Sequence, residues 1–156
     1  MNKEELNIID YNERYKEDFA TLNRAWLQKY FVVEPIDEKI FANSKEYIID
    51  NDGYIFFAKL NDKVAGTFAL IKTEDGVFEL SKMAVAEELQ GKKIGNKMIE
   101  FGLQKAKELK AKKVILYSNT LLQPAIHLYK KYGFKEVPLD AVEYKRANIK
   151  MEIDIK

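Results

Sequence analysis

Three apolar segments separated by tight turns constrain the fold of this chain more than any other feature. They cover residues 54–60, 63–73 and 77–85. The pair Asn61-Asp62 separates the first two, and Glu74-Asp75-Gly76 separates the last two. Connections this short can join only antiparallel strands. The sequence therefore predicts an antiparallel meander of three strands in the middle of the chain.

The flanking segments predict a mixed sheet with helices on both faces. Before the meander we expect a strand at 6–10, a helix with Phe19, Leu22, Trp26 and Tyr30 on one face, and a helical segment at 37–49. After it we expect helices at 94–109 and 123–132 and strands at 113–118, 134–137 and 148–155. A meander that leads into a strand–helix–strand unit indicates an α/β (α+β) protein whose central sheet is mostly antiparallel.

Composition excludes several functional classes. The 156 residues fit one domain, expected to span 1–156, and they contain no Cys and one His. A thiolate nucleophile and a Cys- or His-based metal site are therefore excluded, and we expect no metal. The net charge of +1 argues against a nucleic-acid binder. No membrane span or secretory signal is evident, so we expect a cytoplasmic protein without a membrane partner.

The loop after residue 85 is the most informative segment. Gly91 and Gly95 enclose Lys92 and Lys93, and a helix is expected to begin near Ile94. The first amides of a helix lack internal partners and carry partial positive charge, so this place suits a phosphate or diphosphate. The alternative is a plain strand–loop–helix connection with two solvated lysines. The dinucleotide and P-loop fingerprints do not fit the spacing.

These residues resemble a known family. Gln90-Gly91-Lys92-Lys93-Ile94-Gly95 is similar to the acetyl-CoA-binding signature of the GNAT acyltransferase superfamily, with Lys93 in place of the middle Gly. A second matching block lies downstream, and residues 79–85 resemble the fourth strand of the family. The second block consists of Asn119, Ala125, Tyr129 and Tyr132-Gly133-Phe134.

The resemblance implies a fold, an activity and a cofactor site. It implies that the fourth and fifth strands splay apart and that the chain is an N-acetyltransferase with acetyl-CoA as co-substrate. The implied cofactor contacts come from the fourth strand, the loop after it and three downstream residues: Met83, Ala84, Val85, Gln90, Gly91, Lys92, Lys93, Ile94, Gly95, Asn96, Asn119, Ala125 and Tyr129.

Two residues are candidates for the proton transfers. The resemblance places Tyr129 near the cofactor sulfur, where a phenol protonated at neutral pH can donate to the departing thiolate. The other reading of Tyr129 is core packing on a helical face. Glu79 is the candidate base, because it lies six residues before Val85, about 20 Å along a strand. Met83 and Val85 are expected to share its face. The alternative for Glu79 is an outward-facing position on a half-exposed strand.

The acceptor site is expected between the N-terminal helices and the loop after the last helix. Tyr30, Phe31, Glu34 and Asp37 would offer an aromatic wall and carboxylates to a cationic amine, whereas Trp26 is expected to be core. The resemblance implies that the acceptor is a small-molecule or peptide amine, without separating the two.

Two further readings stay open. One is a non-catalytic acyl-CoA-binding sensor or partner-binding module on the same scaffold. The other is a nucleic-acid binder that uses the lysine clusters, which the net charge disfavours. A homodimer through an exposed sheet edge or the last strand also stays open.

Overall fold

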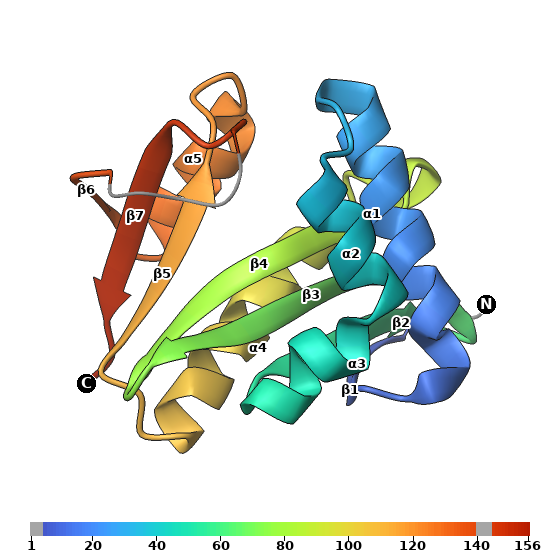
Figure 1. Ribbon diagram of the computed structural model, residues 1–156, viewed down its shortest axis with the longest axis horizontal. Coiled ribbons are helices and arrows are strands. Elements are labelled where there is room, and N and C mark those ends of the chain that lie inside the picture. The colour runs from blue at the N-terminus through green and yellow to red at the C-terminus, as the bar shows by residue number, and fades with distance from the viewer. Residues whose placement is uncertain (1–4, 140–144) are drawn as a thin grey trace.

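A single sheet of seven strands, in the order β1-β2-β3-β4-β5-β7-β6, organises the chain (Figure 1). The computed structural model describes residues 5–139 and 145–156. The first four residues, on which the expectation of no secretory signal partly rests, lie outside this range. So does part of the loop between β6 and β7, which we expected to contribute to the acceptor site. The strands are β1 (Leu6–Asp10), β2 (Tyr54–Leu60), β3 (Lys63–Glu74), β4 (Val77–Val85), β5 (Lys113–Ser118), β6 (Lys135–Val137) and β7 (Ile149–Asp154).

The predicted meander is confirmed. β2, β3 and β4 pair antiparallel in succession, and the bounds of β2 and β4 agree with those expected. Both turns contain a residue with positive φ, Asn61 at 56° and Gly76 at 78°. Asn and Gly are the residues that adopt this conformation at the lowest cost, which explains why the chain reverses there.

β4 and β5 are parallel neighbours that stay paired over only three positions. The pairs are Val77 with Lys113, Phe78 with Val114 and Glu79 with Ile115. Beyond Glu79 the two strands diverge, as Figure 1 shows. β5 is instead held along its whole length by β7. The sheet therefore opens into a V whose apex is at Glu79.

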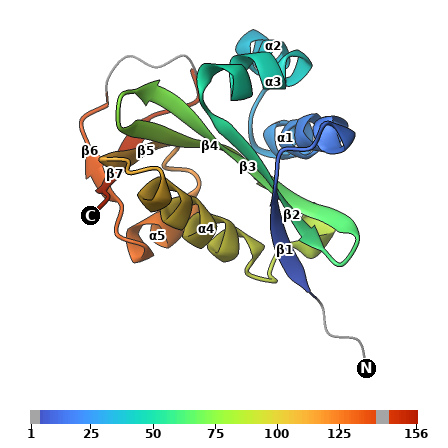
Figure 2. The same ribbon diagram turned by 90° about the horizontal axis from the view of Figure 1, so that it is seen from below.

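In the part of the chain that the structure describes, five α-helices cover the two faces of the sheet (Figure 2). α1 (Lys16–Tyr30), α2 (Pro35–Ala42) and α3 (Ser44–Tyr47) lie on one face, and α4 (Ile94–Glu108) and α5 (Gln123–Lys131) on the other. Each face has its own apolar core, one centred on Phe19, Phe41 and Phe57 and the other on Phe56 and Met98.

Two predictions for the N-terminal helices need correction. The segment expected as one helix at 37–49 is two helices and a short 3-10 turn, because the chain breaks at Asn43. In α1 the buried side consists of Phe19, Ala20, Asn23 and Leu27, not the face containing Tyr30. A rotation of about one residue around the helix separates the two faces. Tyr30 is turned away from the core, whereas Trp26 is half-buried and still packs against it.

A bulge in β4 overturns the expected alternation of its side chains. Lys82 has φ of 55°, and the register to β3 shifts between Ser81 and Ala84. The extra residue reverses the alternation of faces beyond this point. Met83 and Val85 consequently pack against the core on the α4 side with Leu80. They therefore do not share a face with Glu79. The case for Glu79 as a site residue rests instead on its position where β4 and β5 separate.

Candidate active site

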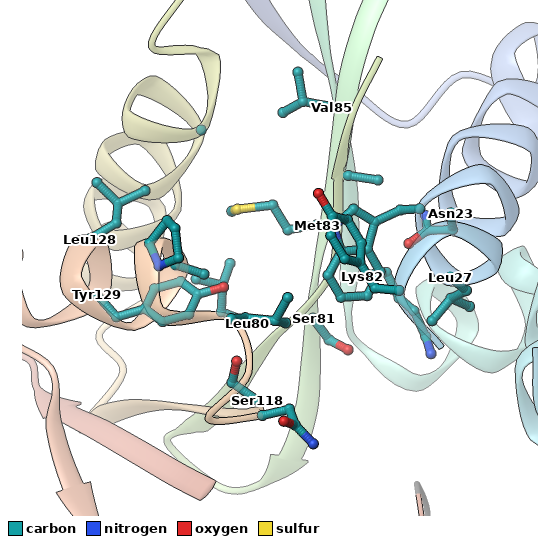
Figure 3. A pocket seen from close by; sticks show the side chains of 18 of the residues that line it. Asn23, Leu27, Leu80, Ser81, Lys82, Met83, Val85, Ser118, Leu128 and Tyr129 are labelled. Carbon is teal, nitrogen blue, oxygen red and sulfur yellow. The ribbon is translucent and has the colours of Figure 1, made fainter. Parts of the chain in front are cut away.

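A cavity of about 590 Å³ occupies the opening between β4 and β5 (Figure 3). Its walls come from α1, β4, the loop before α4, the end of β5, α5 and the segment before β7. The cavity contains nearly every predicted site residue: Tyr30, Phe31, Glu79, Met83, Ala84, Val85, Gln90, Gly91, Lys93, Ile94, Gly95, Asn96, Asn119, Ala125 and Tyr129. Three predicted residues do not line it: Lys92, Glu34 and Asp37.

The start of α4 presents backbone amides to this cavity. Lys93 precedes the helix with φ of 61° and ψ of 28°, and Gly91 has φ of 90°. Within residues 5–139 and 145–156, no acceptor is found for the N–H groups of Gly91, Lys93, Ile94, Gly95 and Asn96. The first internal bond of the helix runs from the Lys97 amide to the Lys93 carbonyl. A row of amides with unused hydrogens and the positive end of a helix dipole forms an anion site.

The edge of β4 that faces β5 is the second feature of the cavity. β5 offers no ladder partner to β4 beyond Glu79. Met83, Ala84 and Val85 lie on this stretch and line the cavity. A strand edge of this kind can pair with an extended ligand that carries amide groups.

Tyr129 projects from α5 toward β4, and its hydroxyl end is directed into the cavity (Figure 3). The ring packs edge-on against Phe134, with 5.9 Å between centroids. Burial raises the pKa of Tyr129 to about 12. The phenol is therefore fully protonated at neutral pH, and the hydroxyl has no hydrogen bond to the residues that the structure describes.

Glu79 lies at the apex of the V, in the wall of the cavity that also contains Ser81 and Lys82. It is half-buried, and its negative charge acts on the nearby Lys82. The bulge at Lys82 directs the Lys82 side chain toward α2. Glu79 is the last residue of β4 that pairs with β5, so it lies where the unpaired edge of β4 begins.

Asn119 has a local structural task at the end of β5. Its Nδ2 donates to the Arg146 carbonyl over 2.7 Å, and its Oδ1 accepts from the Leu121 amide over 2.9 Å. The side chain therefore holds the segment before β7 against the start of α5. Its predicted contact with a cofactor stays a prediction.

A buried network of charged side chains borders the cavity. The sequence analysis did not predict these ion pairs. The Asp37 carboxylate accepts from Arg146 Nη1 and Nη2 over 2.8 and 2.9 Å and from the Glu34 amide over 2.8 Å. Lys82 Nζ lies 3.3 Å from Asp37 Oδ1. The Asp37 and Lys82 side chains are 0% and 3% exposed. The network links α2, the β4 bulge and the segment before β7 across the open end of the V.

The network shifts the pKa values of both buried partners. Burial alone would raise the pKa of Asp37, but hydrogen bonds from Arg146 and the Glu34 amide, with the charge of Lys82, hold it below the ordinary value. Burial lowers the pKa of Lys82 to about 8, although attraction to Asp37 opposes the shift. A capping box at Glu34-Pro35-Ile36-Asp37 and a lysine inside a buried strand were the available sequence signals.

The carboxylates expected to bind the acceptor are engaged elsewhere. Glu34 Oε1 accepts from the Lys145 amide and Oε2 from Arg146, each over 3.0 Å. Neither Glu34 nor Asp37 lines the cavity, so their positions do not support direct contact with substrate. Trp26, expected as core, both packs against the core under α1 and lines the cavity.

The described ranges contain neither a candidate metal cluster nor a helix suited to cross a membrane. These residues contain no group of three or more His, Asp or Glu side chains that could hold a metal ion. None of their helices combines the length and the apolar character that crossing a membrane requires.

Comparison with known proteins agrees with this geometry. The sequence model described as Acetyltransferase (GNAT) family matches residues 13–134. An uncharacterized N-acetyltransferase of Bacillus subtilis (strain 168), YvbK, is 29% identical over 110 residues, which are 69% of this chain and 71% of that protein.

Two solved structures show the same fold. An acetyltransferase of the GNAT family from Staphylococcus aureus Mu50 is 22% identical and has a TM-score of 0.87, covering 97% of this chain and 100% of that one. A Bacillus subtilis acetyltransferase solved in complex with CoA is 20% identical and has a TM-score of 0.73, covering 99% of this chain and 100% of that one. With a family match over most of its length, the chain belongs to the GNAT acetyltransferase family and is an acyl-CoA-dependent N-acyltransferase.

Proposed function

We propose that the chain transfers the acetyl group of acetyl-CoA directly to a primary amine while both substrates occupy the cavity. The amides at the start of α4 carry this proposal, because five of them point to no acceptor in the described protein. A diphosphate supplies the acceptor oxygens that these amides lack. The similar fold of an acetyltransferase solved with CoA supports the same donor.

The open edge of β4 fits the arm that joins the diphosphate to the thioester. Met83, Ala84 and Val85 would pair with the amide groups of the arm, as a neighbouring strand does. The arm then runs from the start of α4 toward Glu79. The thioester carbon comes to lie between β4 and α5, where Tyr129 also ends.

In this arrangement Glu79 acts as the base and Tyr129 as the acid. Glu79 takes one proton from the ammonium form of the acceptor, directly or through a water molecule, and frees the nitrogen lone pair. The nitrogen forms a bond to the thioester carbon, and the carbon–sulfur bond breaks. Tyr129 donates its proton to the departing sulfur, which leaves as the CoA thiol. The acylated nitrogen then loses one of its two protons, and solvent carries this proton back to the Tyr129 phenolate.

The transfer needs no acyl-enzyme. The sequence contains no Cys, so a relay through an acetylated thiolate is excluded. The absence of Cys supports a transfer in which both substrates are bound together when the acetyl group moves.

A titration with acetyl-CoA and one matched pair of variants test the proposal. We expect saturable binding in calorimetry and release of CoA thiol when an amine is added. Tyr129→Phe should lower kcat about 100-fold and leave acetyl-CoA affinity unchanged, because only the acid is removed. Tyr132→Phe is the control, since Tyr132 directly follows α5 and lies outside the cavity.

Two outcomes would overturn the proposal. Absence of binding at millimolar acetyl-CoA would eliminate the donor site. Binding of acetyl-CoA without release of CoA thiol, for every amine tested, would favour the non-catalytic acyl-CoA-binding alternative. Equal losses of kcat and affinity in Tyr129→Phe would reduce Tyr129 to a packing residue.

A further inference from the structure

Three aromatic side chains at the end of α1 form a wall of the cavity. Trp26 packs against Tyr30 and Phe31, with 5.5 and 5.8 Å between ring centroids. Tyr30 is 43% exposed, and neither Tyr30 nor Phe31 belongs to the two hydrophobic cores of the described residues. Their apolar surface therefore remains available to a ligand.

This wall is on the opposite side of the sheet from the proposed diphosphate site. α1 covers one face and α4 the other (Figure 2). The Lys29–Glu87 ion pair of 3.2 Å fixes the end of α1 beside the turn that follows β4. A donor held at the start of α4 enters from the α4 face, so the aromatic wall borders the space left for the acceptor.

The charges around the cavity limit how many cations the acceptor can carry. Among its described lining residues, Glu79 is the one carboxylate. The basic residues Lys82 and Arg146 already form ion pairs with Asp37 and Glu34. The remaining ammonium groups of a polyamine would therefore meet no second carboxylate among the described lining residues. A monoamine presents a single charge.

We infer that the acceptor is a primary monoamine with an aromatic body, which lies against Trp26, Tyr30 and Phe31 while its nitrogen faces Glu79. This inference rests on the proposed function and adds the acceptor class. Burial of a phenyl group against an apolar wall favours such an amine over a short aliphatic one. The single carboxylate among the described lining residues disfavours polyamines.

The test compares three amines as acetyl acceptors by initial rates of CoA thiol release. We expect kcat/KM for 2-phenylethylamine to exceed that for ethylamine and for spermidine by at least about tenfold. Tyr30→Ala should raise KM for 2-phenylethylamine about fivefold and leave kcat and the KM of acetyl-CoA unchanged. Val32→Ala is the control, because Val32 is 76% exposed and close in sequence but does not line the cavity.

The outcomes separate this inference from the proposed function. If spermidine or ethylamine is the better acceptor, or if Tyr30→Ala and Val32→Ala behave alike, the acceptor class is wrong and the donor site stands. The same holds if acetyl-CoA binds but 2-phenylethylamine is not acetylated. Failure of acetyl-CoA to bind would instead overturn the proposed function.

Discussion

Removing either side of the buried Asp37–Arg146 pair should destabilise the protein strongly. The Asp37 side chain is fully buried and accepts two bonds of 2.8 and 2.9 Å from the guanidinium, which is 17% exposed. Asp37→Asn takes this carboxylate from the buried Lys82 and leaves Arg146 with Glu34, and Arg146→Met removes the guanidinium from both Asp37 and Glu34. We expect each variant to lose about 3–5 kcal/mol of unfolding free energy, because an uncompensated charge remains buried.

A double-mutant cycle distinguishes the interaction from the cost of each substitution. The double variant Asp37→Asn/Arg146→Met should lose about 2–3 kcal/mol less than the sum of the two single losses, and this difference is the coupling energy. Guanidinium denaturation followed by circular dichroism gives the four free energies. Additive losses from the two single variants would refute the reasoning.

The chain provides a matched control in a second bidentate pair. Arg24 and Glu38 join α1 to α2 with two bonds of 2.8 Å, but their side chains are 36% and 49% exposed. The geometry is nearly the same and burial differs, so the coupling between Arg24 and Glu38 should be a small fraction of the buried one. Similar coupling energies in the two pairs would show that burial does not determine the strength of the ion pair.

Two other predictions concern the lysines at Lys93 and Lys82. Lys93→Gly should stabilise the fold by about 0.5–1 kcal/mol, because glycine removes the cost of a φ of 61°. The variant should bind acetyl-CoA at least as tightly, since it keeps the backbone amide. A loss of stability in denaturation would contradict this prediction. Burial lowers the pKa of Lys82 to about 8 from the ordinary 10.5, so the folded state binds fewer protons than the unfolded state between these values. The free energy of unfolding should therefore gain a contribution from Lys82 that rises with pH from about 8 toward 10, and Lys82→Met should lack it. If denaturation at pH 7 to 10 shows the same slope for both proteins, Lys82 does not titrate as described.

The order of the elements and most of their bounds follow from local signals. Short turns dictated the meander, and Pro124 and Gly133 mark the two ends of α5 as expected. The loop with Gly91 and Gly95 was recognisable because glycine spacing and a helix start occur together. The binding and catalytic roles of these residues stay predictions. The positions of the residues around one cavity are consistent with those roles.

What the sequence did not reveal depends on contacts between distant segments. Asp37 and Arg146 are 109 positions apart, and nothing local to either residue names its partner. The alternation in β4 failed because a bulge at Lys82 is set by pairing with β3, which a periodicity argument cannot detect. Glu34 was assigned to substrate for the same reason, since its bond to Arg146 is also long-range.

The most direct test of the account follows the backbone amides of residues 91–96 by NMR during titration with CoA and, separately, with pantetheine, which lacks the diphosphate. We predict that CoA shifts the amide resonances of Gly91, Lys93, Ile94, Gly95 and Asn96, whereas pantetheine leaves them in place and perturbs β4 alone. Saturation of the cavity by CoA with these five amides unmoved would contradict the assignment of the donor site.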